Sequence, residues 1–146
     1  MFIIISNLFL ITASFGFTEH DSSRSDIKIE RSIILLFDAS ESMLENNKIG
    51  EAKIAAKNYL TSGILRSRDE VALIVFYDCN DIRVEQPFTT NKVALISKID
   101  DIQPYSLTPL KVSIKFAKDY LDNYARGKVK RIIVYTDGME TCNGEM

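Results

Sequence analysis

Three continuous apolar runs constrain the fold of this chain more than any other feature of its sequence. They are Ile33–Phe37, Val71–Tyr77 and Arg131–Tyr135, the last of which opens on an arginine. A strand with one solvated face alternates apolar and polar residues, so an unbroken run indicates a strand buried on both faces. Segments with helical periodicity separate the runs, at residues 48–65, 91–99 and 109–124. This alternation predicts an α/β fold, with a doubly wound, mostly parallel sheet and helices on both faces.

Single residues refine two of these elements. Residues 82–86 alternate apolar and polar side chains and Pro87 follows them, which predicts a short edge strand that ends at the proline. The helix at residues 48–65 is expected to pack through one face that includes Leu60 and Ile64, with lysines and glutamates opposite. Gly63 weakens the helical pattern in its last turn.

The composition fits one globular domain. The chain has 146 residues, an apolar fraction of 46% and a formal net charge of −2, all ordinary for a folded domain with a real core. It carries no long basic stripe, so nucleic acid is not an expected partner.

The first 17 residues carry no charged side chain and are dominated by Phe, Ile and Leu. This stretch is short for a membrane span and suits the apolar region of a signal peptide. Ser14 and Gly16 are small residues placed for cleavage, although no Lys or Arg precedes the apolar stretch. We therefore expect a signal peptide at residues 1–16, a polar linker at 17–30 and the domain at 31–146, in a protein exported to the periplasm, the cell envelope or the medium. A buried strand and an uncleaved anchor are the alternatives, and only the anchor implies membrane contact.

Oxygen-bearing side chains follow two of the apolar runs. Asp38, Ser40 and Ser42 alternate directly after the first run, and residues two apart project to the same side of an extended chain. Thr108 and Asp137 supply a further hydroxyl and carboxylate. Oxygen ligands are what Mg²⁺ prefers, with Mn²⁺ and Ca²⁺ as alternatives. Each motif also has a local explanation, because Thr108 before Pro109 suits a helix start and Asp137-Gly138 is a common turn.

In combination, these motifs resemble the von Willebrand factor type A domain. The sequences Asp38-Ala39-Ser40-Glu41-Ser42, Ser106-Leu107-Thr108-Pro109-Leu110 and Tyr135-Thr136-Asp137-Gly138 look like the three loops of its metal-ion-dependent adhesion site. The resemblance covers the chain from Arg31 onward and is strongest to exported bacterial members. It implies a Rossmann-like sheet and one divalent cation, held by five residues: Asp38, Ser40, Ser42, Thr108 and Asp137.

Two departures from the family pattern stand out. Ser106 occupies a position where many members have glycine, which is a modest change if the local φ is negative. The family fold continues through further helix–strand units, so the last units are expected to be missing from this chain. The strand at 131–135 would then be an open apolar edge.

The two cysteines, Cys79 and Cys142, form no Cys-x-x-Cys pair, and the only histidine, His20, lies in the linker. A zinc site is therefore poorly supplied with ligands. In the resembling fold, the strands ending at Tyr77 and Tyr135 flank the strand ending at Phe37. Their following loops then rise on one edge, so a Cys79–Cys142 disulfide is one hypothesis. Pairing of Cys142 with a cysteine outside this chain is the other.

The site predicts a binding module rather than an enzyme. A cation with only two protein carboxylates accepts an outside carboxylate, so the expected partner is a protein that presents Asp or Glu, with no small-molecule cofactor. A structural or regulatory subunit of a cell-envelope assembly is the alternative. An aspartate-dependent phosphohydrolase is disfavoured, because Ser40 stands where such an enzyme needs a second carboxylate.

Overall fold

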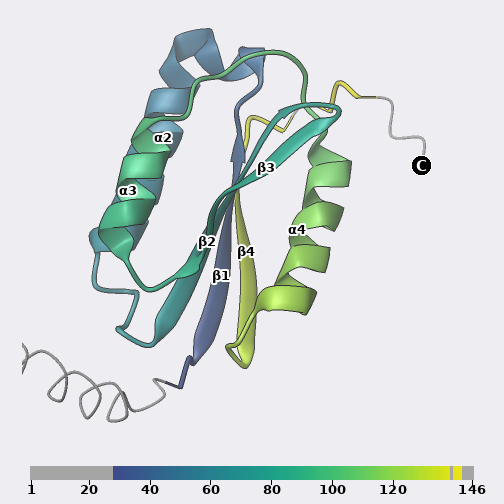
Figure 1. Cartoon of the computed structure of the whole chain (residues 1–146). Coiled ribbons are helices and arrows are strands. Elements are labelled where there is room, and N and C mark those ends of the chain that lie inside the picture. Colours follow the sequence, from purple (N-terminus) through teal and green to yellow (C-terminus); the bar gives the residue numbers. More distant parts are fainter. Residues whose placement is uncertain (1–27, 139, 143–146) are drawn as a thin grey trace, which may run out of the picture.

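The computed structural model describes residues 28–138 and 140–142, which form a four-stranded sheet with helices on both faces (Figure 1). The strands are β1 (Arg31–Asp38), β2 (Asp69–Asp78), β3 (Asp81–Thr89) and β4 (Val129–Tyr135). The sheet order is β3-β2-β1-β4. Strand β1 runs parallel to both β2 and β4, and β3 is antiparallel to β2. The predicted α/β fold with a mostly parallel sheet is confirmed.

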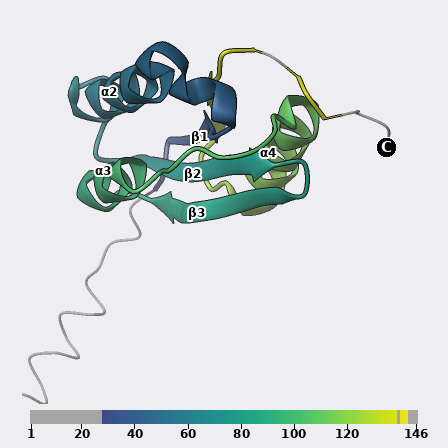
Figure 2. The ribbon, with the colours of Figure 1, turned by 90° about the horizontal axis from the view of Figure 1, so that it is seen from above.

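The helical elements are η1 (Glu41–Asn47), α2 (Lys48–Thr61), α3 (Lys92–Asp100) and α4 (Leu110–Tyr124). Helices α2 and α3 cover one face of the sheet and α4 covers the other (Figures 1 and 2). Alternate residues of β1 enter the two cores: Leu35 packs with α2 and α3, whereas Leu36 packs with α4. Strand β1 therefore needs apolar side chains on both faces, which explains its unbroken apolar run.

Strand β4 is the exception among the three apolar runs. It pairs with β1 on one side, and none of its residues is buried. Val134 is 37% exposed, so the prediction of a strand buried on both faces is wrong for β4 in the described part of the chain. The expectation of an open edge at this strand agrees with its exposure.

The limits of two elements also differ from the prediction. Helix α2 ends at Thr61 instead of Leu65, because Gly63 adopts a positive φ of 83° that ends the helix. Ile64 is consequently 55% exposed and does not join the core. Strand β3 runs through Pro87 to Thr89, and its pairing with β2 is irregular near the proline. A proline is tolerated there because an edge strand does not need every N–H for pairing.

A buried carboxylate joins three segments at the edge of the sheet where β1 and β2 begin. Glu70 is fully buried and accepts hydrogen bonds from Ser32 Oγ at 2.7 Å and from the Arg126 backbone N–H at 2.8 Å. The Arg126 guanidinium donates to the same carboxylate, with Nε at 2.8 Å. A Cβ added to Gly127 would lie 2.6 Å from the backbone of Arg31, so glycine permits this close approach.

The predicted signal peptide, residues 1–16, and linker residues 17–27 lie outside the described residues. Within the described part of the chain, no helix combines the length and apolar character needed to cross a membrane.

Candidate metal centre

The five predicted ligands lie at one edge of the sheet, beyond the carboxyl ends of the parallel strands. Asp38 is the last residue of β1, and Asp137 follows β4 by two residues. A hydrogen bond links their loops, because the Thr136 hydroxyl donates to Asp38 Oδ2 at 2.6 Å. The same Thr136 oxygen accepts from the Gly138 N–H at 3.0 Å. Parallel pairing of β1 with β4 thus brings together two loops that are 98 residues apart.

The first loop places three of the oxygen-bearing side chains next to one another. Asp38 and Ser40 are buried, with 0% and 1% of their surface exposed. The Asp38 Oδ1 atom accepts from the Ser40 N–H at 2.9 Å, so part of this carboxylate serves a local turn. The two serine hydroxyl oxygens, Ser40 Oγ and Ser42 Oγ, lie 3.2 Å apart.

Ser42 lies in the short helix η1, which the sequence patterns did not predict. Asn46 and Asn47, with positive φ values of 50° and 59°, form a kink between η1 and α2. Asparagine is one of the few residues that adopt this left-handed conformation readily. The two adjacent asparagines are the sequence signal that could have indicated this turn.

The loop that carries Thr108 is joined to the first loop by backbone hydrogen bonds. Tyr105 N–H donates to the Ala39 carbonyl at 2.8 Å, and Glu41 N–H donates to the Ser106 carbonyl at 2.9 Å. Ser106 has a φ of +70°, so the negative φ that would make serine a modest change from glycine is not present. A serine here carries the steric cost of the left-handed conformation.

The alternative role of Thr108, as a helix cap before Pro109, is not what the structure shows. Pro109 itself occupies the N-cap position, and α4 begins at Leu110 without a side-chain cap from that residue. Thr108 is 1% exposed and lines the same pocket as Ser42.

Asp137 faces a lysine that sequence reasoning did not include. Lys48, the first residue of α2, places its Nζ 3.0 Å from Asp137 Oδ2, and 3.4 Å from Glu45 Oε2. The Asp137 side chain is only 8% exposed. The hydrogen bond that Lys48 donates to Asp137 is the main cause that raises the pKa of Lys48. The two partners are 89 residues apart in the sequence, so no local sequence pattern predicts this ion pair.

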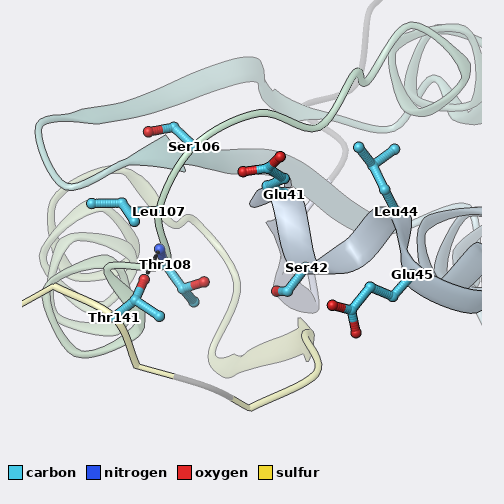
Figure 3. Close-up of a pocket in the computed structure, with 8 residues that line it drawn as sticks. All are labelled: Glu41, Ser42, Leu44, Glu45, Ser106, Leu107, Thr108 and Thr141. Carbon is cyan, nitrogen blue, oxygen red and sulfur yellow. Dashed lines mark hydrogen bonds between the residues drawn. The ribbon is translucent and has the colours of Figure 1, made fainter.

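Two hollows open at this edge of the sheet. The larger, of about 530 Å³, is lined by residues of η1, of the Thr108 loop and by Thr141 (Figure 3). The second, of about 370 Å³, is lined by Asp137, Lys48 and neighbouring residues of α2 and β4. Asp38, Ser40 and Ser42 thus lie next to one another in the first loop. Ser42 and Thr108 line the larger hollow. Asp137 lines the other one, where it pairs with Lys48.

The donor atoms of this edge suit a hard divalent cation. Among residues 28–138 and 140–142, no group of three or more His, Cys, Asp or Glu side chains is gathered for metal binding. A site here would use two carboxylates and three hydroxyls, which is an oxygen-only set. Mg²⁺ binds through one or two carboxylates and keeps several positions for water or a ligand, so the residues present fit that ion.

A disulfide crosses the same edge of the molecule. Cys79, just after β2, is bonded to Cys142, and their Cα atoms lie 5.7 Å apart. The alternative pairing of Cys142 with a cysteine outside this chain is therefore not the arrangement in the structure.

The family model of the von Willebrand factor type A domain matches residues 33–140, which include all of the sheet except the first two residues of β1, and all three loops of the site. The chain belongs to the von Willebrand factor type A family. No curated protein matches this von Willebrand factor type A chain.

Several solved structures share the fold of this domain. The domain is similar to the von Willebrand domain of the type V pili tip protein Mfa5 from Porphyromonas gingivalis, with 22% identity, a TM-score of 0.61 and coverage of 78% of this chain and 40% of that one. The protein BatB from Bacteroides thetaiotaomicron matches with 23% identity, a TM-score of 0.57 and coverage of 70% and 51%. Proximal thread matrix protein 1 from the mussel byssus, with zinc in its MIDAS motif, matches with 19% identity, a TM-score of 0.59 and coverage of 75% and 29%.

These three likenesses show the fold of the von Willebrand factor type A domain. The chain spans between 29% and 51% of the length of the matched structures. The zinc and the pilus belong to those proteins.

Proposed function

We propose that this von Willebrand factor type A domain binds one divalent cation, with Mg²⁺ as the preferred ion, and uses it to capture an acidic side chain of a partner protein. Five residues would hold the ion: Asp38, Ser40, Ser42, Thr108 and Asp137. The observation that carries the proposal is the arrangement of the first loop. Buried Asp38 is linked to the Asp137 loop through Thr136, and the Ser40–Ser42 hydroxyl pair lies beside a pocket shared with Thr108.

The role of each group follows from its chemistry. The Asp38 and Asp137 carboxylates would balance the two positive charges of the ion, and the neutral hydroxyls would complete its protein ligands without adding charge. The bound cation would supply a Lewis-acidic position that accepts an external carboxylate. Ser42 and Thr108 both line the pocket of about 530 Å³, which is open enough for an approaching side chain.

Lys48 has a defined place in this proposal. Its ammonium pairs with Asp137 at 3.0 Å, so a cation that binds Asp137 must displace or share this contact. The lysine would therefore compete with the ion and reduce its affinity.

Calorimetric titration of the purified protein with Mg²⁺ tests the metal site. We expect one binding site in the wild type, and strongly reduced binding in Asp38→Asn and Ser42→Ala. Asp119→Asn and Ser97→Ala are matched controls, because both residues are exposed on helices away from this edge. At an ion concentration of about 100 Kd, bound Mg²⁺ should stabilise the fold by about 2.7 kcal/mol. Unchanged binding in both site variants would refute the assignment.

Capture of a carboxylate needs a separate test. A peptide display library can be selected in Mg²⁺ and counter-selected in EDTA. The recovered peptides should share an Asp or Glu, and replacing it by Asn or Gln should abolish binding. Retention of peptides without an acidic residue would contradict the proposed partner chemistry.

Export is the remaining part of the proposal. Two of the matched structures are a pili tip protein and a protein from the mussel byssus, and the structure holds a disulfide, which persists in oxidising compartments. Residues 1–16 would act as the signal peptide and residues 17–30 as the linker before the domain at 31–146. Amino-terminal sequencing of the exported protein should find a new terminus after Gly16.

A further inference from the structure

The segment Glu140–Cys142, called the latch below, contacts the Thr108 loop directly. The Thr108 N–H donates to Thr141 Oγ1 at 2.7 Å, and the Thr141 N–H donates back to the Thr108 carbonyl at 3.1 Å. The Cys142 N–H also points to this carbonyl, at 3.4 Å. Figure 3 shows the Thr141 side chain against the backbone of Thr108, at the side of the pocket opposite Ser42. The latch therefore holds both polar groups of the Thr108 backbone.

Glu140 ties the latch to the start of α4. Its Oε2 atom accepts the Lys111 N–H at 2.8 Å, and its Oε1 atom accepts the Cys142 N–H at 3.2 Å. The first N–H groups of a helix have no partner within the helix, and Pro109 offers no side-chain cap. Glu140, which follows β4, thus caps helix α4, and α4 begins two residues after Thr108.

The disulfide fixes the other end of the latch to the sheet. Cys142 is 9% exposed and bonded to Cys79, which stands 63 residues earlier in the turn between β2 and β3. The latch itself has no helix or strand, so its position depends on the disulfide, on the Glu140 contacts and on the pair of bonds with Thr108.

We propose that the latch positions Thr108 for the cation, with Thr141 as a positioning residue and the Cys79–Cys142 disulfide as its anchor. Thr108 lies in the loop between α3 and α4, whereas the other candidate ligands lie at or beyond the carboxyl ends of strands β1 and β4. Because no strand end places Thr108, its hydroxyl depends on how its loop is held. The oxidised protein binds the ion tightly, and opening the disulfide releases the latch and weakens the site. This inference rests on the proposed metal site. In an exported protein it would couple cation affinity to arrival in an oxidising compartment.

The first test separates the Thr141 hydroxyl from its volume. Thr141→Val keeps the shape and removes Oγ1, whereas Thr141→Ser keeps the hydroxyl. Residues that orient metal ligands typically contribute 10- to 100-fold to affinity, so we expect Thr141→Val to weaken Mg²⁺ binding about 10-fold by calorimetry. Thr141→Ser should restore most of the affinity. Thr89→Val, on the edge strand β3, is the control for a general loss of a hydroxyl.

The second test opens the anchor. A dithiol reductant breaks the Cys79–Cys142 bond, gives two thiols and is itself oxidised to a cyclic disulfide. The reduced protein and the Cys79→Ser/Cys142→Ser variant should both bind Mg²⁺ more weakly, and thermal melts in EDTA should show that both remain folded. Amide hydrogen exchange at Thr108 should become faster in both, and in Thr141→Val, because its acceptor is lost.

The outcomes distinguish the latch from the metal site. If the wild type binds no Mg²⁺, the proposed function and the latch's role in it fail together. If the wild type binds Mg²⁺ and both Thr141→Val and the reduced protein bind it equally well, the latch is refuted and the metal site stands. If Thr141→Val and Thr141→Ser weaken binding equally, the hydroxyl does not position Thr108, and this part of the inference is wrong.

Discussion

Replacing Glu70 by alanine should cost the domain a large part of its stability. The Glu70 carboxylate is fully buried and joins β2 to Ser32 of β1 and to Arg126 at the turn before β4. Alanine leaves two donors without this acceptor, the Ser32 hydroxyl and the Arg126 backbone N–H. The Arg126 side chain is 63% exposed, so its guanidinium can be solvated by water after the change.

The magnitude follows from these two donors. A buried donor that loses its partner costs about 1–3 kcal/mol, and removal of one partner of a fully buried ion pair costs about 3–5 kcal/mol. Because the guanidinium is partly solvated, we expect a loss of about 3 kcal/mol in the free energy of unfolding. A typical domain has about 5–15 kcal/mol in total. Glu70→Gln keeps one acceptor oxygen and should lose less.

Urea unfolding followed by circular dichroism measures this loss. With a slope of about 2 kcal/mol/M, the midpoint of Glu70→Ala should fall by about 1.5 M. Glu51→Ala is the matched control, since Glu51 is exposed on α2, and a surface change of this kind should stay within about 0.5 kcal/mol. A loss below about 1 kcal/mol in Glu70→Ala would refute the view that this carboxylate holds the three segments together.

Three further outcomes are expected. Lys48→Met should tighten Mg²⁺ binding in calorimetry, because the ammonium no longer competes for Asp137; weaker binding would mean that the lysine helps to form the site. Ser106→Gly should raise the free energy of unfolding by about 0.5–1 kcal/mol, as relief of the left-handed strain exceeds the extra chain entropy of glycine, and thermal melting measures it. The hydrogen bond from Arg31 lowers the pKa of Asp69 below its ordinary 3.8, so this stabilisation is present above pH 3.8 and is lost as the pH falls through the folded-state pKa. Urea midpoints measured at falling pH should therefore decline less steeply in Asp69→Asn than in the wild type.

Local sequence patterns predicted most of the strands and helices of the fold. The apolar runs located β1 and β2 because a strand between two helical layers needs apolar side chains on both faces. The third run located β4, but its exposure was misjudged, since burial depends on neighbours that periodicity does not describe. Gly63 also shows what the pattern misses: the apolar periodicity continues to Ile64, whereas the helix ends before the glycine, which has a positive φ.

The candidate site divides in the same way. Asp38, Ser40 and Ser42 could be placed from sequence, because alternation after a strand is a local property of the chain. The Lys48–Asp137 ion pair spans 89 residues and the Thr108–Thr141 contact spans 33. Neither leaves a periodic trace, since each contact depends on how separate loops meet above the sheet. The sequence alone thus determined the strands and the main helices and showed which oxygen-bearing side chains follow the strands, because these are local properties of the chain. The tertiary structure decided which charges and hydroxyls meet, because that depends on how distant loops pack.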